Sequence, residues 1–252
     1  MTQLQHFLAN LGAVTVLTIQ AFREIFRRPF ELRLLVTQLS LGGVDSWSIT
    51  VLTAIFTGLV MASQFAIGLE PFGASLYTGK LVSLSIVREL GPVLTALLVG
   101  GRVGAGYTAE LGSMAVTEQI DAIRALGADP VRKLVVPRVL AMVISLPLLT
   151  IMADLVGCFG SAVVTVIEVD VTWSFAIQQM LDTIDPYDLN HGLMKSVVFG
   201  YFIAIIGCWM GMRTYGGTEG VGLNTTRTVV FTSITILVSD FLMTRIFLAV
   251  YG

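Results

Sequence analysis

Long apolar stretches separated by short polar segments make up most of the sequence. A helix crosses a bilayer core about 30 Å thick with about 20 predominantly apolar residues. Five stretches reach that length while containing two charged residues at most. The pattern therefore predicts an all-α polytopic membrane protein, a single domain whose residues 47–251 form a five-span bundle. The predicted spans are Trp47–Leu69, Leu81–Gly101, Val139–Ile167, Gly192–Met212 and Thr228–Tyr251.

The composition supports this class and excludes others. Of the 252 residues, 55% are hydrophobic and 13% are charged, about half the charged fraction typical of soluble proteins. The net charge of −2 provides no basic surface for nucleic acid. Cys158 and Cys208 lie in apolar stretches, where a buried thiol is more typical than a disulfide. His6 and His191 have no cluster of metal-ligand residues near them in the sequence, so no metal site is expected.

Basic residues alternate between the segments that connect the predicted spans. Eleven lysines and arginines fall in the segments on one side, whereas Lys80 alone falls on the other. Because cytoplasmic loops are enriched in Lys and Arg, this places the N-terminus in the cytoplasm and the C-terminus outside. The loop between spans three and four agrees, because it has no basic residue and contains Asp170, Asp182, Asp185 and Asp188.

Residues 1–33 predict a helix that lies in the cytoplasmic membrane interface. Apolar residues recur there at helical spacing and a basic cluster follows them. That order, with no evident small-residue cleavage site, argues against a signal peptide; a short sixth span is the alternative. The apolar stripe is Leu4, Phe7, Leu8, Leu11 and Val14, and the basic cluster is Arg23, Arg27 and Arg28.

The second span contains two adjacent charged residues, Arg88 and Glu89, near its middle. Ionised groups at this depth are costly unless they face protein or a water-filled cavity. The two side chains point about 100° apart on a helix, so they do not pair with each other. Pro92, after Gly91, has no N–H to bond the carbonyl of Arg88, which predicts a helix break beside a cavity. We interpret the segment as a binding site near the membrane midplane.

Other intramembrane polar residues leave alternatives open. Arg88 and Glu89 would serve packing alone if they formed an interhelical ion-pair network with Lys195 or Asp240. An ion- or proton-coupled secondary transporter would use Glu89, Asp154, Lys195 and Asp240 as a relay, although five spans with no inverted repeat argue against it. A purely structural scaffold is a third possibility. For Asp154 we expect interhelical hydrogen bonding.

Enzymatic activity is not expected of this chain. The segment from Gly73 to Lys80 resembles a P-loop, but five residues rather than four separate its glycines, and Leu81 stands where Ser or Thr is required. Asp154 and Asp240 lack the local sequences of intramembrane aspartyl proteases.

The polar segment 102–138, between spans two and three, predicts a short amphipathic helix of its own. Thr117 is placed to cap a helix that begins at Glu118. Gly127 and the following Asp129-Pro130 are placed to end it. Such a helix lies on lipid or docks in a partner's groove, and its charged face favours a protein partner. The apolar stripe is Val116, Ile120, Ile123 and Leu126, and the charged face is Glu118, Asp121 and Arg124.

Several motifs, taken in order, resemble the MlaE family of ABC-transporter permeases. The resemblance covers roughly residues 30 to 250 and is most specific from 85 to 150. The matching motifs are Arg88-Glu89-Leu90-Gly91-Pro92-Val93, Gly101-Arg102-Val103-Gly104-Ala105, Ala109-Glu110-Leu111-Gly112, Thr117-Glu118-Gln119-Ile120-Asp121-Ala122, Ala128-Asp129-Pro130, Pro137-Arg138, Ser145-Leu146-Pro147-Leu148, Lys195-Ser196-Val197-Val198-Phe199 and Thr226-Arg227-Thr228-Val229-Val230.

The resemblance implies a homodimeric permease of the bacterial inner membrane that moves phospholipid between the inner and outer membranes and so serves outer-membrane lipid asymmetry. It implies two cytoplasmic ABC ATPase subunits, which bind the ATP, and an external ring of MCE-domain protein. Arg88 and Glu89 become cavity residues near the lipid headgroup, where an arginine suits a phosphate. The lipid chains would contact Met61, Phe65 and Phe72, and the coupling helix, residues 117–127, would use Glu118, Asp121, Ile123, Arg124 and Gly127.

Overall fold

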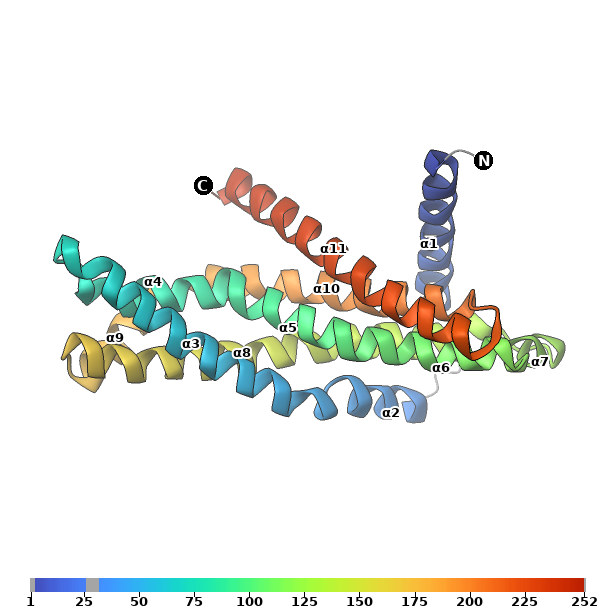
Figure 1. Ribbon diagram of the computed structural model, residues 1–252, viewed down its shortest axis with the longest axis horizontal. Coiled ribbons are helices and arrows are strands. Elements are labelled where there is room, and N and C mark those ends of the chain that lie inside the picture. Colours follow the sequence, from blue (N-terminus) through green and yellow to red (C-terminus); the bar gives the residue numbers. More distant parts are fainter. Residues whose placement is uncertain (1–2, 26–31, 252) are drawn as a thin grey trace.

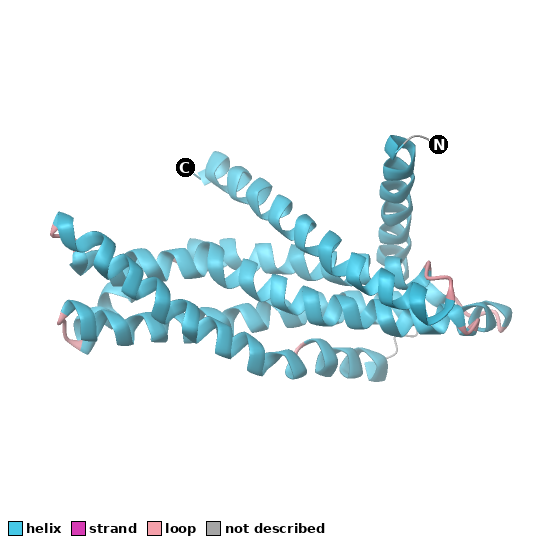
Figure 2. Ribbon diagram, viewed as in Figure 1, coloured by secondary structure: helices cyan, strands magenta, loops and turns pink. Residues whose placement is uncertain are grey.

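The computed structural model describes residues 3–25 and 32–251, and within these ranges the chain is helical with short connections and no strand (Figure 2). Arg27 and Arg28 of the predicted basic cluster lie outside the described residues, as do the side chains of Leu4, Phe7, Leu8 and Leu11. The α-helices are α1 Gln3–Ile25, α2 Leu32–Gly42, α3 Trp47–Leu69, α4 Thr78–Ser85, α5 Gly91–Val99, α6 Ala105–Val116, α7 Gln119–Ala125, α8 Val136–Val169, α9 Trp173–Thr183, α10 Pro186–Met212 and α11 Gly217–Tyr251.

Short helical turns of other kinds join several of these helices. Three are 3₁₀ turns: η1 Val44–Ser46, η2 Glu70–Phe72 and η3 Ser75–Tyr77. Three are π turns: η4 Ile86–Leu90 and η5 Gly100–Gly104 lie within the continuous helix of the second span, and η6 Val131–Val135 begins the helix of the third span.

Among the described residues, five helical segments are long and apolar enough to cross a membrane, which confirms the predicted number. Each begins before the predicted span because the residues that precede the apolar stretch belong to the same helical segment. The second span reaches Val116, so residues 102–116 continue this helix and only residues 117–130 form the separate connection that was predicted for 102–138. The spans are Leu32–Phe72, Ser75–Val116, Val131–Val169, Pro186–Met212 and Gly217–Ala249.

The spans form an elongated bundle with one short helix at each end (Figure 1). α3 packs along α8, α8 along α10, and α10 along α6. α11 begins beside α6 and diverges from the bundle toward the C-terminus (Figure 1). α7 lies beyond one end of the bundle and α9 lies at the other (Figure 1).

The apolar core lies where the second, third and fourth spans meet, and α1 packs against it from the side. Leu17 and Ala21 of α1 are buried in this core, and Thr18 shares a hydrogen bond with Tyr201 of α10. α1 runs across the long axis of the bundle (Figure 1) and is not one of the five apolar spans. The placement of this helix in the membrane interface stays a prediction. Fully buried core residues include Val99, Leu111, Met142, Phe199 and Ile203.

Glycines let α3 and α8 approach until their backbones touch. A Cβ atom at Gly58 would overlap the carbonyl oxygen of Gly157, and one at Gly160 would lie 2.8 Å from the carbonyl oxygen of Ile55. Small residues permit such close helix crossings in membranes, where packing rather than hydrophobic burial drives association. The first span is therefore held to the bundle by main-chain contact with α8.

We expect Gly58→Ala to destabilise the protein by about 1–3 kcal/mol, the usual cost of overpacking. Gly68→Ala is the matched control, because Gly68 lies in the same helix with nothing near its Cα and should gain about 0.5–1 kcal/mol from helix propensity. Apparent melting temperatures of the purified variants in detergent would measure both. Equal shifts in the two variants would contradict the close crossing.

Candidate functional site

The π turn η4 carries Arg88 and Glu89 in the second span. The backbone N–H of Gly91 donates to the carbonyl of Ile86, five residues back, and α5 begins there with Pro92 in its first turn. The π turn accommodates Pro92, whose missing N–H leaves the carbonyl of Arg88 without its α-helical partner. The predicted break at Gly91 and Pro92 is therefore wrong: the helix continues with one extra residue in a turn, a feature frequent at functional sites.

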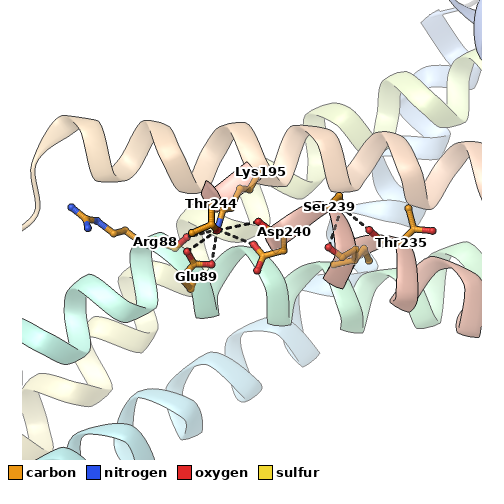
Figure 3. Close-up of polar contacts among 8 residues, drawn as sticks. Arg88, Glu89, Lys195, Thr235, Ser239, Asp240 and Thr244 are labelled. Atoms are coloured by element: carbon orange, nitrogen blue, oxygen red, sulfur yellow. Dashed lines mark hydrogen bonds and ion pairs between the residues drawn. The ribbon is translucent and has the colours of Figure 1, made fainter. Parts of the chain in front are cut away.

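Lys195 of α10 is the centre of a polar cluster and is completely buried. Its Nζ lies 2.5 Å from Glu89 Oε2 and 2.8 Å from Asp240 Oδ1. It also donates to Thr244 Oγ1 at 2.7 Å. Figure 3 shows the four side chains converging from the second, fourth and fifth spans. The interhelical ion-pair network that was one alternative for this region is therefore present.

The lysine also compensates for the proline. The carbonyl of Arg88 has no α-helical partner because Pro92 lacks an N–H, and Lys195 Nζ lies 3.3 Å from that carbonyl oxygen as a donor. The Thr244 hydroxyl lies 3.0 Å from both Glu89 Oε1 and the carbonyl oxygen of Asp240. The ammonium group of Lys195 thus pairs with the acidic side chains and also satisfies the backbone carbonyl of Arg88.

Arg88 points away from this cluster (Figure 3) and makes a separate ion pair. Its Nε lies 2.5 Å from Oδ1 of Asp188, which is buried, whereas the arginine side chain is 40% exposed. Asp188 is held in place because it forms a capping box with Asp185 at the start of α10. The guanidinium is therefore oriented by a fixed carboxylate, while part of the arginine side chain stays exposed.

Sequence reasoning missed the roles of Asp188 and Thr244. Asp188 was assigned only to an acidic external loop, although Asp185-Pro186 followed by an acid at 188 is the signature of a helix start. Thr244 has no comparable signal, because a threonine four residues after Asp240 is unremarkable until the partner helices are known.

Asp154 does not join the Lys195 cluster in the described contacts. It lies on α8, and its Oδ1 occupies the space beside Gly91 that a Cβ atom would fill. That oxygen is buried, and no hydrogen-bond partner for it occurs among the described residues. The interhelical hydrogen bond expected for Asp154 is therefore absent at Oδ1, and of the four relay residues only Glu89, Lys195 and Asp240 meet.

The three predicted acyl-chain residues do not share one helical face. Met61 and Phe65 are half-buried on α3, but α3 ends at Leu69, and Phe72 lies in the turn η2 with 82% of its side chain exposed. Pro71 explains the difference, since it lacks the N–H that would continue the α-helical hydrogen bonding. Phe72 thus lies off the helical face of Met61 and Phe65, and contact of the three residues with lipid stays a prediction.

The amphipathic helix predicted between spans two and three is present as α7, with a different start. The Thr117 hydroxyl donates to the carbonyl of Ser113 at 2.8 Å, so Thr117 continues α6 instead of capping α7. Glu118 takes the N-cap position in a left-handed conformation, with φ of 58°. Gly127, with φ of 76°, follows the helix as predicted.

The apolar stripe of α7 is divided between the bundle and solvent. Ile120 is buried, Ile123 is half-buried, and Leu126 is 85% exposed at the end of the helix. Arg124 Nη1 pairs with Asp121 Oδ1 at 2.8 Å, and both side chains are mostly exposed. α7 thus anchors by its first turn and presents Leu126 and a charged pair outward.

The sequence matches the family model described as "Permease MlaE" over residues 35–246. The chain is 39% identical over 244 residues to a probable ABC transporter permease protein of Rickettsia conorii, covering 97% of this chain and 94% of that protein. It is 38% identical over 217 residues to the intermembrane phospholipid transport system permease protein MlaE of Haemophilus influenzae, covering 84% and 82%. It is 35% identical over 239 residues to the chloroplastic protein TRIGALACTOSYLDIACYLGLYCEROL 1 of Arabidopsis thaliana, covering 93% and 67%.

We expect Lys195→Met to destabilise the protein by about 3–5 kcal/mol, because it leaves Glu89 and Asp240 without their buried counterion. Lys80→Met, at an exposed position, is the control and should have little effect. Adding Glu89→Gln and Asp240→Asn to Lys195→Met removes the unpaired charges and should restore much of the stability. The yield of monodisperse protein and its apparent melting temperature report on all three; a stable single variant would disprove the compensating role of Lys195.

Proposed function

The chain belongs to the MlaE permease family, and from this we propose that it is the membrane-spanning subunit of an ABC transporter that moves phospholipid between the inner and outer membranes. The observation that carries the proposal is the 38% identity to the phospholipid-transport permease of Haemophilus influenzae over 84% of this chain. ATP hydrolysis belongs to a separate ATPase subunit, and this chain contributes the path for the lipid.

Coupling to the ATPase is assigned to α7. A docking helix needs an exposed apolar residue to enter a groove and charges to fix its orientation. Leu126 and the Arg124–Asp121 pair supply these on a helix whose Ile120 is buried against the bundle. Movement of the bound ATPase would therefore be passed to α6 and the second span.

Orientation follows from the charges at the two ends of the bundle. Arg124 and Lys133 lie near the α7 end, whereas Asp170 and Asp182 lie near α9. The enrichment of basic residues on the cytoplasmic side puts α7 in the bacterial cytoplasm and α9 toward the periplasm, where an MCE-domain protein would receive or deliver lipid. The N-terminus is then cytoplasmic and the C-terminus periplasmic.

The polar cluster supports the transport path in two ways. Arg88 is held by Asp188 with part of its side chain exposed, an arrangement suited to a lipid phosphate. The Lys195 cluster joins the second, fourth and fifth spans, so these helices move together when two copies of the chain close on a shared cavity.

A proton-coupled secondary transporter is the second candidate, and the meeting of Glu89, Lys195 and Asp240 favours it. The two functions differ in their requirement for an ATPase. A proton-coupled carrier transports without one, whereas an ABC permease is inactive alone.

We expect Arg124→Glu to lower the lipid-stimulated ATPase activity of the assembled complex, because it places a second negative charge beside Asp121 on the docking face. A loss of about 1 kcal/mol in coupling corresponds to about fivefold lower stimulation. Lys80→Glu makes the same charge reversal at the opposite end and should leave stimulation unchanged. Normal stimulation in Arg124→Glu, with the complex intact, would remove α7 from the coupling role.

The proposed function is tested by native mass spectrometry of the tagged chain extracted gently from its own membranes. We expect two copies of the chain, two ATPase subunits, an MCE-domain oligomer and bound phospholipid. A tagged multi-pass protein of unrelated function from the same membranes controls for adventitious lipid. Recovery without an ATPase, under conditions that keep other ABC complexes intact, would favour the proton-coupled carrier.

A further inference from the structure

A groove with an apolar lining lies between α8, α9 and α10, apart from the polar cluster. The groove has a volume of about 250 Å³, larger than the roughly 150 Å³ cavity that accepts a benzene molecule in another protein. Ala162 and Met180 form its buried floor. Leu155 and Leu181 stand at its rim, with exposed fractions of 64% and 70%.

The groove is continuous with the surface that faces the membrane. Its lining on α8 lies within the third span, Val131–Val169, and on α10 within the fourth, Pro186–Met212. Of the two rim leucines, Leu155 lies on the exposed apolar side of the third span, and Leu181 lies on α9. The part of the mouth that the two spans form therefore faces hydrocarbon, and a hydrocarbon chain fills a groove whose lining is apolar except for Asp154 at little cost in hydrogen bonds.

Asp154 is the one acidic residue in the lining, and its placement agrees with an apolar occupant. The residue is 7% exposed, and its Oδ1 lies against Gly91, on the π-turn side of α8. The groove is thus left with hydrocarbon walls. Val87, which precedes Arg88 in the π turn, also lines the groove.

We propose that the groove between α8, α9 and α10 of each copy holds one acyl chain of a resident membrane phospholipid, seated behind the π turn that carries Arg88 and Glu89. The acyl chain packs against Val87 and so supports the π turn. In this turn Arg88 pairs with Asp188, and Glu89 pairs with Lys195. This site lies outside the polar cluster and does not depend on the proposed transport function.

Photocrosslinking tests the site. The full chain, in vesicles of phosphatidylethanolamine and phosphatidylglycerol, is exposed to phosphatidylglycerol that carries a diazirine in its acyl chain, and adducts are mapped by mass spectrometry. We expect adducts at groove residues of α8 and α9. Ala162→Phe fills the floor and should abolish them, whereas Met152→Phe, on α8 but outside the lining, should retain them. Groove adducts that persist in Ala162→Phe, or adducts spread evenly over the lipid-facing helices, would overturn the proposal.

The native cysteines provide a test that needs no substitution. Cys158 lines the groove, whereas Cys208 is fully buried elsewhere. In detergent, removal of phospholipid should speed alkylation of Cys158 by N-ethylmaleimide, and added phosphatidylglycerol should slow it again. Cys208 should stay unreactive throughout. An alkylation rate at Cys158 that does not change with phospholipid would overturn the proposal. Protection of Cys158 that persists after delipidation would also overturn it, because it would show that a protein segment covers the groove.

Discussion

The buried ammonium of Lys195 constrains the membrane-embedded part of the molecule more than any other group. A charge in the apolar interior is tolerated only with counterions and hydrogen-bond acceptors around it, and no single helix supplies enough of them. Glu89 from the second span and Asp240 with Thr244 from the fifth are drawn to one point on α10. The register of three helices is thereby set by one side chain.

The π turn and the close glycine crossing act on the same helices from two sides. Inserting one residue at Ile86–Leu90 directs Arg88 and Glu89 to separate partners, while Gly58 and Gly157 hold the first span against α8. Both features position the helices through the backbone and not through large side chains. If a partner that binds α7 is to move the spans, the contacts between helices must be rigid and α7 must be exposed at the end of the bundle. The two features and the position of α7 meet these requirements.

Features that depend on local pattern were predictable, and those that depend on tertiary partners were not. The five spans, α7 and Gly127 follow from hydropathy and helix-ending signals. The partners of Lys195 and the free oxygen of Asp154 depend on which helix faces are opposed, which no window of sequence encodes. Pro92 was misread because a π turn can continue a helix past a missing N–H. Phe72 was placed on the helical face of Met61 and Phe65 because Pro71 was overlooked. Both errors concern helix continuity at proline.

The order in which the cluster residues occur along the chain bears on its synthesis. Lys195 emerges from the ribosome after Glu89 but 45 residues before Asp240, so the fourth span enters the membrane with its counterion set incomplete. The cluster closes only when α11 arrives. A chain truncated before Asp240 would expose a half-paired lysine within the bilayer, which gives membrane quality control a physical means of distinguishing unfinished chains from finished ones.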